Sequence, residues 1–343
     1  MKALLNTLYV QTQGACLRLD HETLKVEIEG QVKLQVPLHH LGAVVLFGEI
    51  SVTPRLIARC AADGRAITWL SRAGRFHGRL EGPVSGNVLL RRAQHEALGH
   101  PGRTLEIARN CVAGKVKNLR TAVLRSARET DSAQDEEPLR TAAGVLSDIL
   151  KSLPAAADLD TLRGMEGEAA RHYFGVFAHM ILADRHLFSF AGRNRRPPLD
   201  PVNALLSFLY AMLLNDCVSA AQGVGLDPQV GFLHALRSGR PALGLDLMEE
   251  LRPILADRLA LTLINRRQLT DHDFDRRQGG AVLLNDSGRK TVVVAYQERK
   301  QEEISHPVVD QKMPLGLVPH IQARLLARHL RGDLAAYPPY VHH

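Results

Sequence analysis

Cysteine is scarce in this sequence, and the few cysteines stand far apart. Only four of the 343 residues are cysteine, and no two of them form a Cys-x-x-Cys pair. They are Cys16, Cys60, Cys111 and Cys217. Zinc ribbons, iron–sulfur sites and disulfide-bonded scaffolds need cysteines at short, regular spacings. The pattern therefore argues against all three, and a reducing cytoplasm is the simplest compartment for such a chain.

Long apolar runs are also missing. Runs such as Ala43–Phe47 and Val292–Ala295 fall far short of the ~20 residues that are needed to cross a bilayer. The first residues lack the long apolar region and the small-residue cleavage site of a secretory signal. We therefore expect a cytoplasmic protein that has no membrane segment.

Several catalytic signatures are absent as well. The sequence contains no Gly-x-Ser-x-Gly elbow, no Walker A lysine loop, no His-Glu-x-x-His and no Gly-x-Gly-x-x-Gly after a strand. These absences weaken the cases for an esterase, a nucleoside triphosphatase, a zinc protease and a dinucleotide-dependent enzyme.

What the sequence does have is an excess of basic charge. It carries 43 lysines and arginines against 36 aspartates and glutamates, which gives a formal net charge of +7 at pH 7. The excess weakly favours a polyanionic partner, although a protein can be basic without having one. At about 150 residues per domain, the length favours roughly two domains.

The first eighty or so residues are typical of β-structure. Apolar and polar residues alternate over residues 24–28 and 32–36, which predicts two strands with one dry face each. The glycine between them marks a hairpin. Pairing Ile28 with Val32 would keep the apolar residues on one face, so we predict the three-residue loop Glu29-Gly30-Gln31.

Beyond residue 86 the pattern becomes helical. Apolar residues recur at helical spacing over Arg103–Arg128, and the other side of this predicted helix is basic. Asp200-Pro201 is typical of a helix start and predicts a long helix over Val202–Ala221. We therefore predict an α+β protein of two domains. Its parts are a small β-rich N-terminal domain, a linker and a larger all-α C-terminal domain, at residues 1–85, 86–102 and 103–343.

One glutamate lies between two glycines in a segment of helix-forming residues. Gly164 and Gly167 each cost a helix about 1 kcal/mol relative to alanine, and Glu166 lies between them. Such a cost is typical of a place where another backbone or a ligand comes close. The alternative is that the glycines only allow tight helix packing and that Glu166 is solvated.

Further metal-ligand candidates lie near residue 240. His234 follows an apolar triplet, while Asp246 and Glu249 are three residues apart, so a helix places both carboxylates on one face. Together with Glu166 they form a candidate site for Mg²⁺ or Mn²⁺, which carboxylates suit better than they suit Zn²⁺. Such an ion beside a basic surface is typical of phosphodiester chemistry. Alternatively, His234 is a partly buried core residue and the acidic residues complement a helix dipole.

Four segments carry a resemblance to a known family. They are LRGMEGEAARHYF (162–174), RNRRPPLDPVNALLSFLYAMLL (193–214), GFLHALRSGRPALGLDLMEELRP (231–253) and ARNCVAGKVKNLR (108–120). The first three are similar to the signature segments of the CRISPR-associated endonuclease/integrase, the metal-dependent subunit of the spacer-acquisition complex. The fourth resembles the basic helix that follows the linker in that family. The resemblance covers most of the chain.

The resemblance implies a role for each acidic candidate. The catalytic metal ligands of the family fall on Glu166, His234 and Glu249. Asp246 is implied as a further metal ligand or as its close support. The cofactor implied is Mn²⁺ or Mg²⁺.

The resemblance also implies contacts with DNA. The basic residues that would contact phosphates are Lys115, Arg120, Arg193, Arg195 and Arg196. For the three arginines at 193–196, a solvated loop is the alternative. Asn203 and Tyr210 match recurring positions of the family and are implied to order the site.

The implied reaction is transesterification without a protein nucleophile. The 3′-hydroxyl of a short captured DNA attacks a phosphodiester at the leader–repeat junction, and water in its place gives nuclease activity. The implied partners are double-stranded DNA (captured fragment and CRISPR repeat), a second copy bound through the β-rich domain, and a second, smaller CRISPR adaptation protein. The alternatives are a non-catalytic DNA-binding scaffold with a structural metal site and an unrelated metallohydrolase of small substrates.

Overall fold

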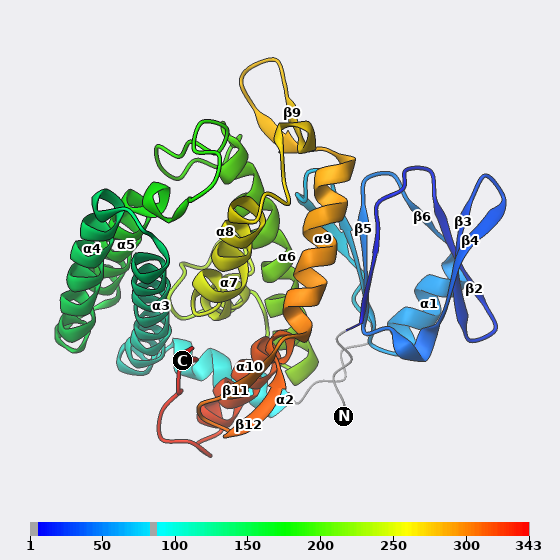
Figure 1. Cartoon of the computed structure of the whole chain (residues 1–343). Helices are drawn as coiled ribbons and strands as arrows, with labels where there is room; N and C mark the ends of the chain where they lie inside the picture. The colour runs from blue at the N-terminus through cyan, green and yellow to red at the C-terminus, as the bar shows by residue number, and fades with distance from the viewer. Residues whose placement is uncertain (1–5, 83–87, 343) are drawn as a thin grey trace. The chain divides into compact units, whose positions relative to one another are not determined.

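The structure is a computed structural model that describes residues 6–82 and 88–342. The chain divides into two compact units, with the division between Ser85 and Gly86 (Figure 1). The first unit is β-rich and the second is mostly helical, which confirms the predicted fold class.

In its described residues, the N-terminal unit consists of two small sheets, one α-helix and a short 3₁₀ turn at Leu38–His40. Its strands are β1 (Thr7–Val10), β2 (Cys16–Asp20), β3 (Thr23–Ile28), β4 (Gln31–Pro37), β5 (Ala43–Phe47), β6 (Ser51–Val52), β7 (Ala66–Leu70) and β8 (Phe76–Arg79). One sheet has the order β1-β5-β7-β8 and the other β4-β3-β2-β6. Helix α1 (Pro54–Ala62) begins at a proline in its first turn and buries Leu56 and Cys60 in a core shared with both sheets.

The β3–β4 hairpin follows the predicted pairing except at its tip. Leu24 faces Val36 and Val26 faces Leu34, but an irregularity then shifts the register, so that Ile28 faces Gln31. The loop is therefore the two residues Glu29 and Gly30, and the predicted three-residue loop is wrong. Both loop residues have positive φ angles, 50° and 75°, which suit a tight turn between twisted strands.

Nine α-helices and one π-helical segment make up most of the described part of the C-terminal unit. They are α2 (Val88–Leu98), α3 (Pro101–Glu129), α4 (Ala133–Ser152), α5 (Leu159–Gly175), α6 (Pro201–Val224), α7 (Ala242–Glu249), a π-helical turn (Arg252–Asp257), α8 (Arg258–Asn265), α9 (Asp286–Gln301) and α10 (Val318–Leu330). Helix α3 packs against α4 and α5, and α7 packs against α3, α6 and α10. This packing brings α3, α5 and α7 together around the candidate site.

The C-terminal unit departs from the predicted organisation in two ways. It contains two short hairpins where only helices were predicted, and a helix occupies the segment that was predicted as a linker. The hairpins pair β9 (Phe274–Arg276) with β10 (Val282–Leu284) and β11 (Glu303–His306) with β12 (Gln311–Pro314). The C-terminal unit is thus mostly helical and not all-α. Most of the described part of the predicted linker 86–102 is helix α2, which packs against α3 and α10. Residues 86 and 87 lie outside the described residues.

Helix α6 forms the centre of the helical unit. Asp200 Oδ1 accepts a hydrogen bond from the backbone N–H of Asn203 at 2.7 Å and so caps the helix start. The helix ends at Gly225, whose φ angle of 94° suits glycine. By length and composition α6 is apolar enough to cross a membrane, but 61% of its most apolar stretch is buried inside the protein.

Candidate active site

Glu166, His234 and Glu249, which the sequence predicts as ligands, lie in one cluster, and the ammonium of Lys115 contacts both glutamates. Lys115 projects from α3 and forms an ion pair with Glu166 of α5. It forms a second ion pair with Glu249, at 2.6 Å between Nζ and Oε2. His234 Nε2 lies 3.7 Å from Glu249 Oε1, and Arg252 Nη1 lies 2.8 Å from the same oxygen. Segments far apart in sequence therefore converge here.

The buried Asp246 carboxylate holds the loop that carries His234. Its oxygens accept hydrogen bonds from three successive backbone N–H groups, those of Phe232, Leu233 and His234, at 2.5, 3.0 and 3.0 Å. The His234 Nδ1 atom lies 2.7 Å from Asp246 Oδ1 and donates the fourth hydrogen bond. A carboxylate has about four lone-pair sites, so Asp246 is fully used. His234 Nε2 is left with its lone pair for another partner.

Gly231 allows this loop to lie close to α7. A Cβ atom placed on Gly231 would lie 2.6 Å from the backbone carbonyl carbon of Ala242 and 2.7 Å from Asp246 Oδ2. Carbon atoms do not approach each other or oxygen this closely without a shift of the surroundings. Any side chain at this position would therefore move the loop, and with it His234, away from Asp246.

The glycines beside Glu166 leave an open stretch of helix surface. A Cβ atom at Gly164 or Gly167 would meet no atom of the described residues within 4 Å. Tight helix packing, the alternative raised by the sequence, therefore does not explain them. The helix surface at these two glycines is therefore open.

Neighbouring cations keep the buried Glu249 ionised. Burial by itself would raise the pKa of Glu249, but the positive charges of Arg252 and Lys115 outweigh it and lower the pKa to about 2. The next residue, Glu250, is equally buried but has no such cations, and burial raises its pKa to about 8. Near neutral pH, Glu249 is therefore ionised, whereas the carboxyl group of Glu250 is mostly protonated and neutral.

The carboxyl group of Glu250 binds the C-terminal segment of the chain. It accepts hydrogen bonds from Tyr337 Oη at 2.8 Å, from the Tyr340 backbone N–H at 2.7 Å and from Gln322 Nε2 at 2.9 Å. Asn118 Nδ2 of α3 donates to the backbone carbonyls of Glu250 and Tyr340, at 2.8 and 2.9 Å. Glu250 is therefore a structural neighbour of the site and does not face it.

A tyrosine connects Arg252 to a second buried carboxyl group. The Arg252 guanidinium lies over the Tyr210 ring, 5.1 Å from its centroid. The Tyr210 hydroxyl donates to Asp257 Oδ1 at 2.6 Å, and the Tyr173 hydroxyl donates to Asp257 Oδ2 at 3.1 Å. Tyr210 thus orders Arg252, which in turn pairs with Glu249.

The five residues predicted to contact DNA differ in how accessible their side chains are. Lys115 is buried among carboxylates, and Arg193 donates to Asn203 Oδ1 at 2.6 Å while it lies over the Tyr210 ring, so neither side chain is available to a phosphate in this structure. Arg120 is partly buried. Arg195 and Arg196 are exposed and stay predictions.

Three arginines near His234 were not predicted from the sequence: Arg163, Arg237 and Arg240. Burial lowers the pKa of Arg240, and so do the nearby positive charges of Arg237, Arg195 and Arg163. Arg163 Nε also donates, at 2.8 Å, to the backbone carbonyl that precedes His234. The only signal in the sequence was that Arg163, Arg237 and Arg240 lie in the same segments as the predicted ligands, where each one resembles an ordinary surface charge.

The donor atoms of the cluster fit a hard divalent cation once Lys115 is moved. In the described ranges, 6–82 and 88–342, no three His, Cys, Asp or Glu side chains are already arranged as a metal site. However, Glu249 Oε2 is buried without a hydrogen bond, and its contact with Lys115 is an ion pair only. Two carboxylates and one imidazole nitrogen are ligands that Mg²⁺ and Mn²⁺ accept.

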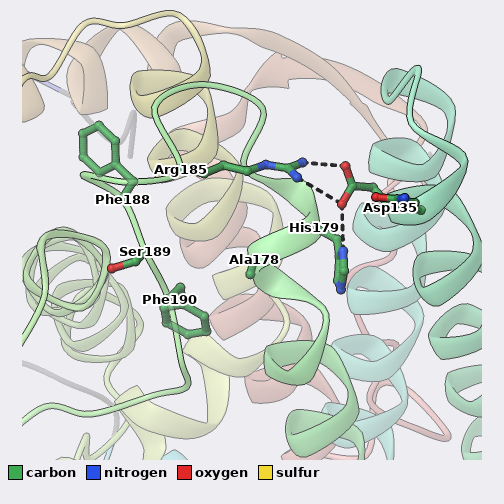
Figure 2. Close-up of a pocket in the computed structure, with 8 residues that line it drawn as sticks. Asp135, Ala178, His179, Arg185, Phe188, Ser189 and Phe190 are labelled. Carbon is green, nitrogen blue, oxygen red and sulfur yellow. Dashed lines mark hydrogen bonds and ion pairs between the residues drawn. The ribbon is translucent and has the colours of Figure 1, made fainter.

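A pocket elsewhere in the helical unit has a different character. Its lining includes Asp135, His179 and Arg185, and its volume is about 300 Å³ (Figure 2). Asp135 Oδ1 lies 2.8 Å from His179 Nδ1, and Asp135 Oδ2 accepts from Arg185 at 2.6 Å. None of its lining residues is one of the predicted site residues.

Comparisons with known proteins show which family the chain resembles. The sequence model described as CRISPR associated protein Cas1 matches residues 8–298. A CRISPR-associated endonuclease Cas1 from Moorella thermoacetica is 59% identical over 342 residues, which is 100% of each chain. Another from Rhodospirillum rubrum is 56% identical over 344 residues, 99% of each chain. A solved Cas1 structure from Thermotoga maritima has a TM-score of 0.82 at 25% identity, over 95% of this chain and 97% of that one.

The family match and these relatives define a CRISPR-associated endonuclease. The chain belongs to the Cas1 family.

We expect Asp257→Asn to change how stability depends on pH. Burial raises the pKa of Asp257 from 3.8 to about 6, so the folded protein keeps a proton that the unfolded chain releases in this window. Wild-type stability therefore falls as pH rises from below 3.8 to above 6, by on the order of 3 kcal/mol from this group. The asparagine variant does not have this loss. Urea unfolding at several pH values measures it, with the exposed Asp148→Asn as control, and a constant difference from wild type would contradict the expectation.

Proposed function

We propose that this chain is the integrase of CRISPR spacer acquisition, a metal-dependent enzyme that joins the 3′-hydroxyl ends of short captured DNA to leader–repeat DNA. The observation that carries the proposal is the convergence of Glu166, His234 and Glu249, with His234 held by a saturated Asp246. With water in place of the 3′-hydroxyl, the same arrangement gives DNA nuclease activity.

Glu166, Glu249 and the Nε2 atom of His234 are the side chains that would hold the cofactor, Mn²⁺ or Mg²⁺. Bound there, the ion would polarise the scissile phosphate and stabilise the negative charge that develops on it. Asp246 would not be a ligand, because its lone pairs are already used by the loop. Its role would be to fix the tautomer and the orientation of His234.

The protein would contribute no nucleophile of its own. The 3′-oxygen of the captured DNA would form the new bond to phosphorus, and the bond from phosphorus to the 3′-oxygen of the leader strand would break. The protein's task would be to hold both DNA ends and to support the charge on the phosphate.

The arginines beside His234 would bind the DNA backbone. Arg195 and Arg237 are exposed, and Arg163 and Arg240 lie near them. Phosphate contacts position a protein on DNA without reading its sequence, which suits an enzyme that accepts varied captured fragments. The net charge of +7 would then be concentrated where the substrate binds.

The partners would be a second copy of this chain, a second small CRISPR adaptation protein and double-stranded DNA. A solved "Cas6-RT-Cas1--Cas2 complex" contains a chain with the same fold, at a TM-score of 0.83 and 23% identity, over 99% of this chain and 36% of that one. For the second copy, β4 offers an edge strand on which Val32 and Leu34 are 38% and 43% exposed. The complex would work in the cytoplasm, where the cysteines stay reduced.

A non-catalytic DNA-binding scaffold, the alternative from the sequence, is not favoured. The curated relatives with 59% and 56% identity are named endonucleases. A scaffold would also have no need for a histidine whose free nitrogen faces a buried carboxylate.

Joining of a short duplex to repeat-containing DNA tests the proposal. In Mn²⁺, the variants Glu166→Ala, His234→Ala and Glu249→Ala should each lose joining by at least roughly 100-fold, because each removes a ligand. DNA binding should change little. Glu168→Ala, an exposed residue on the same helix, is the control, and EDTA should abolish joining by the wild type. Full joining by all three variants would refute the site.

The arginine surface is tested by the salt dependence of DNA binding. Arg195→Ala and Arg237→Ala should each weaken binding and reduce the slope of log affinity against log salt by about one. Arg140→Ala on α4 is the control and should leave the slope unchanged. Wild-type slopes in both variants would exclude this surface as the DNA path.

The second copy is tested by sedimentation at micromolar concentration. The wild type should sediment as a dimer, and Leu34→Glu should shift it toward the monomer because a charge then lies on the edge strand. Leu182→Glu, an exposed leucine of the helical unit, should leave the dimer intact. A wild-type monomer would contradict the proposed interface.

A further inference from the structure

A single buried ammonium bridges the two carboxylates of the proposed metal site. The Lys115 side chain is 6% exposed and forms ion pairs with Glu166 of α5 and with Oε2 of Glu249, the last residue of α7. The other Glu249 oxygen, Oε1, pairs with Arg252. Lys115 therefore links the carboxylates of Glu166 and Glu249 by a direct ion pair to each.

This ammonium and a divalent cation cannot share the same place. Both need the free oxygens of Glu166 and Glu249, and positive charges at such short range repel strongly in a buried site. Lys115 Nζ lies 2.6 Å from Glu249 Oε2, so a cation at this oxygen has to replace that contact. A lysine also has a flexible four-carbon stem, so its ammonium can leave while its backbone stays in α3.

We propose that Lys115 is a resident cation that holds the metal-free site together and that a divalent ion displaces when it binds. The inference rests on the proposed metal site and adds a competitor to it. In the metal-free protein the lysine compensates the two carboxylates, which would otherwise repel each other. Metal binding is then weaker than the ligands alone would give, because breaking the two ion pairs is part of the binding reaction.

If the ion pairs of Lys115 had only a structural role, the expected change in metal affinity on removing Lys115 would have the opposite sign. If Lys115 merely holds α3, α5 and α7 in place, its removal loosens the ligands and weakens metal binding. If it competes with the metal, its removal strengthens metal binding, although the metal-free protein becomes less stable. The sign of the change in metal affinity therefore separates the two roles.

Titration of the full-length protein with Mn²⁺ alone, followed by calorimetry, measures this sign. Lys115→Met keeps most of the length of the side chain but removes the charge, and it should bind Mn²⁺ about tenfold more tightly than the wild type. Lys115→Arg keeps the charge and should stay close to the wild type. Lys117→Met, two residues along α3 and exposed, is the matched control and should bind as the wild type does.

Thermal unfolding gives a second readout that does not involve activity. In EDTA, Lys115→Met should unfold at a temperature several degrees below the wild type, since two carboxylates lose their shared cation. Added Mn²⁺ should raise its midpoint by more than it raises that of the wild type. A folded Lys115→Met that binds Mn²⁺ as weakly as the wild type, or more weakly, would overturn the inference and leave the metal site standing. Absence of Mn²⁺ binding by the wild type would overturn the metal site itself.

Discussion

A carboxylate that is removed from water must be paired or neutralised, and Glu249 is buried at the end of α7. Its charge is compensated by Lys115 of α3 and by Arg252 of the π-helical turn, and its carboxylate also faces His234 of the loop before α7. Each partner comes from a different segment, so one negative charge determines where three segments must lie. The packing of α7 against α3 and α6 is the arrangement in which these partners can reach it.

Further contacts restrict the positions of the side chains around this charge. Asp246 fixes the ring of His234, and the absence of a side chain at Gly231 lets the loop come near enough for that contact. Tyr210 restricts Arg252 on the other side. Environment also explains why successive glutamates differ: cations surround Glu249, whereas neutral donors surround Glu250.

The sequence predicted what depends on local spacing and missed what depends on distant partners. The three-residue interval between Asp246 and Glu249 was enough to place both on one helix face, and strand alternation was enough to pair Leu24 and Val26 correctly. A lysine in a basic helix is usually exposed, and Lys115 is buried only because carboxylates 51 and 134 residues away meet it, which no local pattern shows. The ligand set itself came from the family resemblance. The short β9–β10 and β11–β12 hairpins span too few residues for alternation to be visible.

The hydrogen bonds of Glu250 have a consequence for the order in which the protein is made. Synthesis proceeds from the N-terminus, so Tyr337 and Tyr340 leave the ribosome after every residue of the candidate site. Until then Glu250, the immediate neighbour of Glu249, lacks two of its three donors. The side chains of the candidate site are thus all synthesised before the 337–340 segment can supply its two hydrogen bonds to the neighbouring Glu250.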